Sequence, residues 1–469
     1  MSRSNPNSQF IIRNSNSAPR VHLIGIGGIG MSSLAYWFLG QKWLVSGSDT
    51  QESVITQDLL KRGVRVKIGH KSAYVDPRTD LVIHNQAISR ENPELRRAKQ
   101  LKIGTLSYPQ MIGNITRLYT TVAIAGAHGK STTTALTALI MNKARLDPSV
   151  IIGTRLKEFN NTNSRVGKSD YLVLEADEYG RAFLNYQPIY GVITNIDKEH
   201  LDIYRDLQDI KNTFLKYISG FRPGGGLVLN KDDRNLFSLK SKIDKIAKKN
   251  GLRVIWYSLE GPIAAKVKKI IQVPGKHNLS NATGAHVLAT KFLGVSEKDS
   301  LSAIKSFRGT WRRMELVGKY GGALVFDDYA HHPTEIKATL SAFKEKYPNK
   351  KIVCVFQPHL SDRLTKLFGD FLTAFNDADE TLILPIYKVA GRENDAKHKT
   401  SQDLTRSIQK KQPRKPLFYM GHPKDLHLAL ASFGPLNKRV IVMMGAGDIV
   451  SLTQKLIRAT PPSGTRKGC

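Results

Sequence analysis

Two segments of this 469-residue chain pass from an apolar run through a glycine-rich turn into a helical pattern. The first reads VHLIGIGGIGMSSLAYWFL, and the second reads TTVAIAGAHGKSTTTALTALIM. A strand that runs through glycines directly into a helix is typical of a parallel, doubly wound α/β sheet. Later apolar runs end in polar residues, as in DYLVLEAD, YGVITNID and RVIVMMGAGD. These runs indicate further parallel strands.

The length of the chain and the spacing of these patterns predict three α/β domains. The strand pattern lapses at SYPQMIGNITR and again before ALVFDDYAHHP. We therefore expect a Rossmann-like first domain, a central P-loop ATPase domain and a Rossmann-like C-terminal domain. The expected bounds are 21–107, 108–311 and 312–460, with a disordered tail at 1–20 and a short tail at 461–469.

The composition favours a folded intracellular protein. The sequence has no run of about 18 apolar residues, and its polar start lacks the apolar middle of a secretory signal. We therefore expect a cytoplasmic protein without membrane insertion. The two cysteines, Cys354 in the run IVCVF and Cys469 at the last position, suggest one core thiol and one exposed thiol.

The chain is strongly basic, with 71 Lys and Arg residues against 39 Asp and Glu residues and a net charge of +32. Such a charge attracts phosphorylated metabolites, nucleic acid or anionic lipid. The basic residues are spread widely and form no ribonucleoprotein or metal-finger signature. We therefore expect no specific nucleic-acid partner. We expect the protein to be a monomer or a homodimer.

The turn GAHGKS has the residue types of a triphosphate-binding loop. Its glycines let backbone N–H groups approach phosphate oxygens, Lys130 can neutralise the terminal phosphates, and the Ser131 hydroxyl can reach Mg²⁺. Ile124 stands where the full Walker spacing has a glycine, so this is a shortened variant; the plain alternative is an ordinary glycine turn. The predicted ATP-binding residues here are Gly126, Ala127, His128, Gly129, Lys130, Ser131 and Thr132.

Two later segments offer hard oxygen ligands after predicted strands. They are EADE, with Glu175, Asp177 and Glu178, and NIDKEHLD, with Asn195, Asp197, His200 and Asp202. Mg²⁺ needs only one or two carboxylates beside a triphosphate. Acidic residues at strand ends are also common as solvated turns or helix caps, but ligands bind at the carboxyl ends of such strands.

The first glycine turn matches the spacing Gly25-x-Gly27-x-x-Gly30, and Asp49 ends the next apolar run. A pyrophosphate can bind at the start of the helix, and Asp49 can accept hydrogen bonds from a ribose. NAD and UDP-sugars share both groups. The motif alone therefore leaves the nucleotide open, and a tight turn without a ligand is a further alternative.

Taken in order, nine segments of the chain resemble the Mur ligase family. They are GIGGIGMSSLA, GAHGKSTTT, EADEYGRAFLNYQP, TNIDKEHLD, GKHNLSNA, TWRRMELVG, DDYAHHPTEI, FQPHLSDR and MGAGDI. The match runs from Val21 to about Leu452. The resemblance implies ATP- and Mg²⁺-dependent ligation of L-alanine to the lactyl carboxylate of UDP-N-acetylmuramate, in peptidoglycan precursor synthesis.

The resemblance also implies a role for each matching position. For ATP it implies the GAHGKS turn, with His277, Asn278 and Asn281 on the adenine side and Arg312 at the phosphates. For Mg²⁺ it implies Ser131, Glu175 and His200. For the UDP-sugar it implies Gly25, Gly27, Gly28, Gly30, Asp49 and His70. Around the muramoyl carboxylate and alanine it implies Asp328, Tyr329, His331 and Arg363, with Lys130, His200, Asp328, His331 and Arg363 as catalytic residues.

Three alternatives remain open from the sequence. One is a ligase of the same family that attaches a recycled peptide to UDP-N-acetylmuramate. Another is an NAD-dependent dehydrogenase with an accessory P-loop, motivated by GIGGIG. The third is a basic nucleic-acid-binding ATPase.

Overall fold

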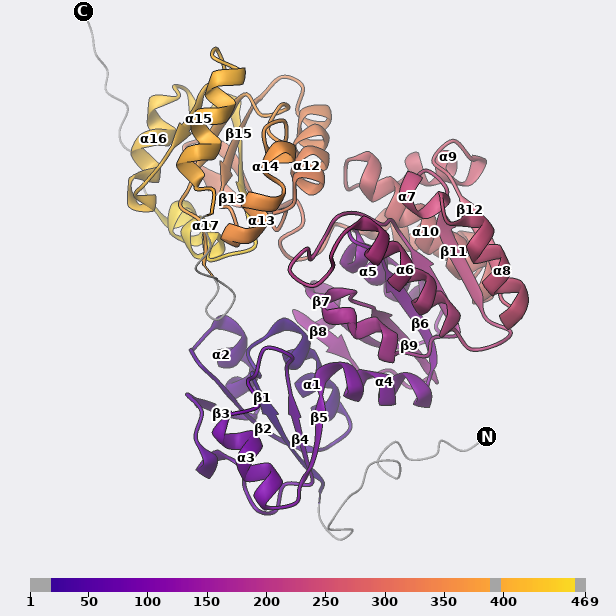
Figure 1. Ribbon diagram of the computed structural model, residues 1–469. Coiled ribbons are helices and arrows are strands. Elements are labelled where there is room, and N and C mark those ends of the chain that lie inside the picture. The colour runs from indigo at the N-terminus through magenta and orange to yellow at the C-terminus, as the bar shows by residue number, and fades with distance from the viewer. Residues whose placement is uncertain (1–17, 389–397, 460–469) are drawn as a thin grey trace, which may run out of the picture. The chain divides into compact units, whose positions relative to one another are not determined.

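A computed structural model describes residues 18–388 and 398–459, which contain three separate β-sheets (Figure 1). The chain divides into two compact units. The first comprises residues 18–198, 205–270 and 280–306, and the second comprises residues 199–204, 271–279, 307–388 and 398–459. The predicted tail at 461–469 and residues 1–17 of the N-terminal tail lie outside the described residues.

The first sheet has five parallel strands in the order β3-β2-β1-β4-β5. Its strands are β1 (Arg20–Ile24), β2 (Leu44–Asp49), β3 (Arg65–Ile68), β4 (Leu81–His84) and β5 (Gly104–Ser107). Its helices are α1 (Ile29–Gly40), α2 (Val54–Lys61), α3 (Pro93–Gln100) and α4 (Tyr108–Leu118), with a short 3₁₀ turn η2 (Ser72–Tyr74). The order reverses at β1, and in open parallel sheets ligands bind beside such a reversal, at the carboxyl ends of the strands.

The second sheet has seven strands in the order β12-β11-β10-β6-β9-β7-β8, and only β8 pairs antiparallel with its neighbour. The strands are β6 (Thr120–Ala125), β7 (Ser149–Leu156), β8 (Thr162–Arg165), β9 (Tyr171–Glu175), β10 (Tyr190–Ile193), β11 (Gly226–Asn230) and β12 (Arg253–Tyr257). The accompanying helices are α5 (Lys130–Lys143), α6 (Leu207–Ser219), α7 (Arg234–Phe237), α8 (Lys240–Asn250), α9 (Pro262–Lys268), α10 (Lys276–Phe292) and α11 (Glu297–Ser306), with 3₁₀ turns η3 (Lys157–Phe159) and η4 (Tyr179–Asn185).

The third sheet has six strands in the order β13-β14-β18-β15-β16-β17, with β13 antiparallel to β14. The strands are β13 (Glu315–Tyr320), β14 (Ala323–Asp328), β15 (Lys351–Phe356), β16 (Glu380–Ile383), β17 (Leu417–Tyr419) and β18 (Arg439–Met444). The helices are α12 (Pro333–Lys346), α13 (Ser361–Lys366), α14 (Phe368–Phe371), α15 (Ser401–Lys411), α16 (Leu426–Ser432) and α17 (Ile449–Arg458), with 3₁₀ turns η5 (Pro423–Asp425) and η6 (Leu436–Lys438).

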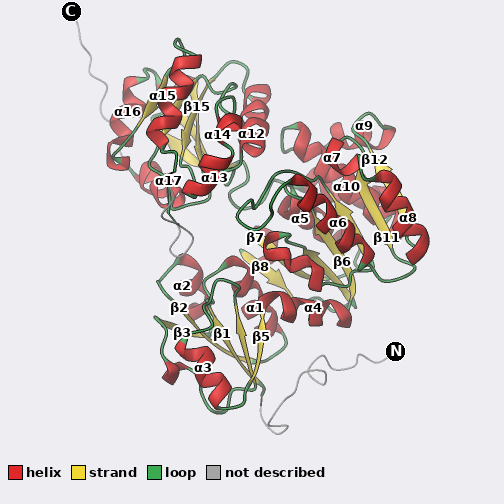
Figure 2. Ribbon diagram, in the orientation of Figure 1, coloured by secondary structure: helices red, strands yellow, loops and turns green. Residues whose placement is uncertain are grey.

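Strand β15 shows why the third sheet is buried on both faces. Its side chains alternate, so Ile352, Cys354 and Phe356 pack into one apolar cluster while Val353 and Val355 pack into another. Each cluster is completed by helices, which flank the yellow strands in Figure 2. A parallel strand covered on both faces must be apolar at successive positions. Cys354 is fully buried, which confirms the predicted core thiol.

The three α/β sheets confirm the predicted fold class. The first lapse in the strand pattern has a structural reason, because most of SYPQMIGNITR forms helix α4, which follows β5 and precedes β6 along the chain. The domain bounds at 107 and 311 stay predictions. Among the described residues, no helix has the length and apolar character needed to cross a membrane.

We predict that Glu380→Gln weakens the third sheet. The Arg439 guanidinium donates to both oxygens of Glu380, at 2.8 Å and 2.7 Å, and both side chains are buried. Because the substitution leaves a buried charge unpaired, we expect the opening free energy of β15, β16 and β18 to fall by about 3 kcal/mol. Hydrogen exchange of these strands measures it. Glu297→Gln, in an exposed ion pair with Lys266, is the control and should leave exchange unchanged.

Candidate functional site

The turn between β6 and α5 needs glycine at two positions. Gly126 has φ 133° and Gly129 has φ 83°, conformations that other residues rarely adopt. A Cβ atom at Gly126 would overlap the Thr194 hydroxyl, and one at Gly129 would overlap the Asn281 amide. Both glycines therefore let the turn lie tightly against its neighbours, with the start of α5 directly behind it. A helix start with exposed backbone N–H groups attracts phosphate.

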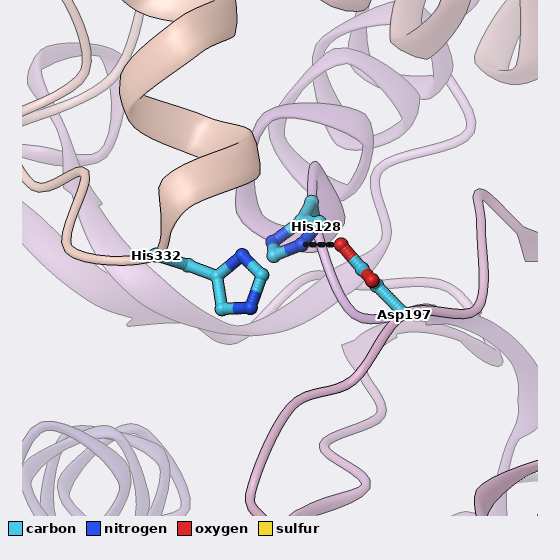
Figure 3. Close-up of side chains that lie close together, drawn as sticks. All are labelled: His128, Asp197 and His332. Carbon is cyan, nitrogen blue, oxygen red and sulfur yellow. Dashed lines mark hydrogen bonds and ion pairs between the residues drawn. The ribbon is translucent and has the colours of Figure 1, made fainter. Parts of the chain in front are cut away.

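The backbone of His128 is held by residues that follow β10. Its N–H donates to Asn195 Oδ1 at 2.8 Å, and its carbonyl accepts from Asn195 Nδ2 at 2.9 Å and from Thr194 Oγ1 at 2.6 Å. The imidazole Nε2 lies 3.0 Å from Asp197 Oδ2, the contact drawn in Figure 3. Asn195 and Asp197, which the sequence suggested as Mg²⁺ ligands, thus hold His128 in the turn before α5.

Lys130 lies among carboxylates at the start of α5. Its ammonium group is 2.8 Å from Glu178 Oε2 and 3.7 Å from Asp177 Oδ1, and it donates to the Ala127 carbonyl at 3.2 Å. Burial raises the pKa of Glu178, and the Lys130 ammonium group opposes that shift. Although burial lowers the pKa of Lys130, the carboxylates outweigh it and raise that pKa overall, so the amine carries a proton at neutral pH.

Ser131 and Glu175 form a second pair beside the turn. The Ser131 hydroxyl donates to Glu175 Oε1 at 2.9 Å, and the Gly153 N–H donates to Glu175 Oε2 at 2.7 Å. Burial raises the pKa of Glu175, while Lys130 opposes that shift. A hydroxyl and a carboxylate at hydrogen-bond distance are oxygen donors of the kind Mg²⁺ selects. Ser131 and Glu175 therefore fit a Mg²⁺ site. The predicted Mg²⁺ contact of His200 stays a prediction, and so do the predicted ATP contacts of Thr132 and Asn281.

The first sheet brings together the residues predicted for the UDP-sugar. The Gly27 N–H donates to Asp49 Oδ2 at 2.8 Å, and the Gly25 N–H donates to the Ser48 carbonyl at 2.8 Å. Gly28 is the residue before α1, and Gly30 faces the Tyr108 ring. His70 follows β3, with Nδ1 3.1 Å from the Ser48 hydroxyl. The turn, Asp49 and His70 therefore lie at the carboxyl ends of three adjacent strands.

In the second unit, Glu199 lies close to two predicted catalytic residues. Arg363 donates to Glu199 Oε2 at 3.3 Å, and His331 Nε2 is 3.9 Å from Glu199 Oε1. Although burial raises the pKa of Glu199, Arg363 and the nearby histidines outweigh it and hold that pKa well below its usual range. Burial, with Arg363, lowers the pKa of His331 to about 4. His331 is therefore a neutral imidazole near pH 7.

Asp328 and Arg312 have structural partners in the same unit. Asp328 ends β14 and accepts from the backbone N–H groups of Met314 and Ala330, at 2.8 Å and 2.9 Å. Arg312, only 3% exposed, is 3.2 Å from Asp327 and donates to the Gly445 carbonyl at 2.7 Å. These contacts position the strand end and leave the predicted substrate and phosphate roles of both residues untested. The half-exposed Tyr329 ring lies 5.2 Å from the Arg312 guanidinium carbon.

Helix α10 begins with the predicted adenine-side residues. Asn278 Nδ2 donates to the carbonyl of Pro274, four residues earlier, at 2.7 Å. Burial lowers the pKa of His277 to about 4, and its Nδ1 is buried without a hydrogen-bond partner. An unsatisfied buried nitrogen calls for an explanation, and ligand contact is one.

The sequence analysis missed the contacts that three carboxylates make in these sites. They are Glu178 on Lys130, Glu199 on Arg363, and Glu94 on the two imidazoles of His22 and His70. Glu178 and Glu199 stand in the acidic segments EADE and NIDKEHLD, but the pattern favoured Mg²⁺ or solvent for such residues. Glu94 follows Asn92 and Pro93, a pattern that signals only a helix start.

Comparison with known proteins agrees with this arrangement. Residues 20–120 match the model described as the Mur ligase family catalytic domain, residues 124–289 match the Mur ligase middle domain, and residues 312–448 match the Mur ligase glutamate ligase domain. This chain belongs to the Mur ligase family. The predicted family is therefore confirmed.

Individual Mur ligases extend the match over nearly the whole chain. A UDP-N-acetylmuramate–L-alanine ligase of Alkaliphilus metalliredigens is 37% identical, covering 93% of this chain and 96% of the relative. One of Clostridium botulinum strain Hall is 41% identical, covering 80% and 84%. The solved structure of the UDP-N-acetylmuramate-alanine ligase of Thermotoga maritima matches with a TM-score of 0.76 at 25% identity, covering 94% of this chain and 98% of that one.

We predict that His277 makes this Mur ligase sensitive to acid. Its folded pKa of about 4 lies below the ordinary value of 6.5, so the neutral form stabilises the folded state above pH 6.5. That stability is lost as the pH falls from 6.5 toward 4, because the unfolded chain binds the proton first. When the pH is lowered from 7.5 to 5, the melting temperature of His277→Gln should therefore fall less than that of the wild type. An equal fall in both proteins would contradict the assignment.

Proposed function

We propose that this protein joins L-alanine to the lactyl carboxylate of UDP-N-acetylmuramate at the expense of ATP, a step of peptidoglycan precursor synthesis in the cytoplasm. The observation that carries the proposal is the near full-length similarity to ligases of that name, at 37% and 41% identity. Two separate glycine turns, at the starts of α1 and α5, support it because the reaction needs two nucleotides.

The turn before α5 would hold the ATP phosphates. Lys130 would neutralise charge on the transferred phosphoryl group. It must be protonated to do so, and the neighbouring carboxylates keep it protonated. Ser131 and Glu175 would hold Mg²⁺, which when bound supplies positive charge to the phosphate oxygens. Asn281, against Gly129, would contact the adenosine side.

The chemistry has two balanced steps. A lactyl carboxylate oxygen attacks the γ-phosphorus of ATP, the bond to the bridging oxygen breaks, and ADP leaves, which gives an acyl phosphate. The neutral amine of alanine then attacks the acyl carbon, phosphate leaves, and the amine loses one proton as the amide forms. Activation is needed because a carboxylate does not condense with an amine in water.

The carboxyl ends of the third sheet would receive the amino acid. Arg363 already donates to a carboxylate, that of Glu199, so its guanidinium group suits the carboxylate of alanine or of the lactyl group. With its pKa near 4, His331 can accept the amine proton through the neutral range. His200 is the other candidate base. Asp328 and Tyr329 would line the same site.

A peptide-recycling ligase of the same family is the second candidate. It uses the same nucleotides and differs only in the amine that it accepts, so the glycine turns do not separate the two. The relatives at 37% and 41% identity carry the name of the alanine enzyme, which favours alanine. Neither a dehydrogenase nor a nucleic-acid-dependent ATPase is favoured by this similarity.

We predict that the protein, given ATP, Mg²⁺, UDP-N-acetylmuramate and single amino acids, releases phosphate in step with a new amide product only with L-alanine or a close analogue. Mass spectrometry of the product and a phosphate assay measure the two outputs. A tripeptide acceptor tests the recycling ligase. Phosphate release without any amide product, whichever amine is supplied, would refute the proposal.

We predict that Lys130→Ala reduces kcat for ATP-dependent ligation by at least about 10²- to 10³-fold, because charge on the transferred phosphoryl group loses its counter-ion. Binding of UDP-N-acetylmuramate, measured by calorimetry, should stay within about twofold, because its proposed site lies in the first sheet. Lys242→Ala, an exposed lysine of α8, is the matched control. Equal loss of both functions would contradict the separation of the two nucleotide sites.

A further inference from the structure

A carboxylate with no solvent exposure, Glu94, lies at the start of α3 in the first sheet's domain. Its two oxygens are shared between two imidazoles: His22 Nε2 is 2.6 Å from Oε2, and His70 Nδ1 is 2.6 Å from Oε1. The Ser48 hydroxyl donates to the same carboxylate at 2.8 Å and 2.9 Å. Burial raises the pKa of Glu94, but these donors outweigh it and lower that pKa overall.

The two histidines differ in what lies beyond them. His22 is enclosed, only 1% exposed, and its second nitrogen lies 3.0 Å from the Ser46 hydroxyl. The His70 side chain is 17% exposed and follows β3 at the carboxyl end of the sheet. His22 therefore holds Glu94 from within the core, while His70 links Glu94 to the surface of the domain.

An ionised carboxylate can only accept hydrogen bonds, so the Nδ1 atom of His70 must be the donor. In a neutral imidazole the proton on Nδ1 leaves Nε2 with a lone pair, which makes it an acceptor. In metal sites, a carboxylate that accepts a hydrogen bond from one ring nitrogen of a histidine fixes the tautomer and the ring orientation in the same way.

His70 also has a defined place in the row of predicted UDP contacts. The sheet order β3-β2-β1 puts His70, Asp49 and the Gly25–Gly30 turn on adjacent strands. If the pyrophosphate binds at the start of α1 and the ribose near Asp49, the uridine end points toward β3. The hydrogen-bond donors at that end are the uracil N3–H and the ribose hydroxyls.

We propose that Glu94 is a positioning residue which fixes the Nδ1–H tautomer of His70, so that Nε2 accepts a hydrogen bond from the uridine end of the UDP-sugar. This inference rests on the proposed function for its nucleotide. It assigns discrimination for the nucleoside to a carboxylate that does not touch the ligand.

The test uses the full chain and the variants Glu94→Gln and His70→Gln. Glu94 uses a separate oxygen for each imidazole, whereas a glutamine amide has one oxygen and one NH₂ group, so the two imidazoles cannot both keep their present contacts and tautomers. We expect the Kd of UDP and the KM of the UDP-sugar to rise about tenfold, with kcat and the KM of ATP nearly unchanged. Glu91→Gln, an exposed glutamate just before α3, is the matched control.

Two further measurements separate positioning from a merely structural role. Nitrogen NMR of the histidine side chains, assigned with His70→Gln, should show the Nδ1–H form of His70 in wild type and its loss in Glu94→Gln. Binding of 3-methyl-UDP, 2′-deoxy-UDP and 3′-deoxy-UDP identifies the donor: one of these should bind wild type more weakly than UDP. Glu94→Gln and His70→Gln should each bind that analogue and UDP almost equally.

The outcomes distinguish this inference from the proposed function. If wild type fails to bind UDP, or if ATP displaces it, the proposed function fails. If wild type binds UDP but Glu94→Gln keeps the same affinity and the same His70 tautomer, only the positioning role is overturned. Equal affinity of wild type for UDP and all three analogues overturns it too, as does a Glu94→Gln variant that loses UDP-sugar and ATP binding together.

Discussion

The parallel pairing of strands is the constraint on which the candidate sites depend. In a parallel sheet all carboxyl ends meet at one edge, so residues that follow different strands become neighbours without any sequence proximity. In the second sheet this brings the turn after β6 beside Glu175 at the end of β9 and Asn195 after β10. In the first sheet it brings Gly27, Asp49 and His70 to one edge. The chemistry is therefore carried by loops, while the strands supply their positions.

Each cation assigned to substrate binding also has a carboxylate partner within the chain. Lys130 pairs with Glu178, Arg312 with Asp327, and Arg363 with Glu199. A buried cation needs such a partner, because an unpaired charge in a low-dielectric interior is costly. The partner also holds the side chain in one place, so a phosphate or carboxylate bound there would meet an oriented charge rather than a flexible one. Electrostatic stability and readiness for an anionic substrate thus have the same structural cause.

Much of the fold could be predicted because its signals are local. Glycines between an apolar run and a helical pattern located the turns before α1 and α5, and apolar runs such as KIVCVF located buried strands. The positions of the GAHGKS turn before α5 and of Glu175 at the end of β9 were likewise predictable, because each follows an apolar run. The structure adds that Asn195 and Asp197 hold His128, a task that the hard-ligand pattern did not suggest.

Contiguous residues were enough to predict the fold class, the family and the two glycine turns before α1 and α5, because the backbone requirements of these features are local. The pairing of the charged groups, in contrast, became visible only in the folded chain. Lys130 and Glu178 are 48 positions apart, His22 and Glu94 are 72 apart, and Glu199 and Arg363 are 164 apart. Partner choice follows from strand order and from burial, which raises the cost of an unpaired charge. Neither is written in the spacing of residues along the chain.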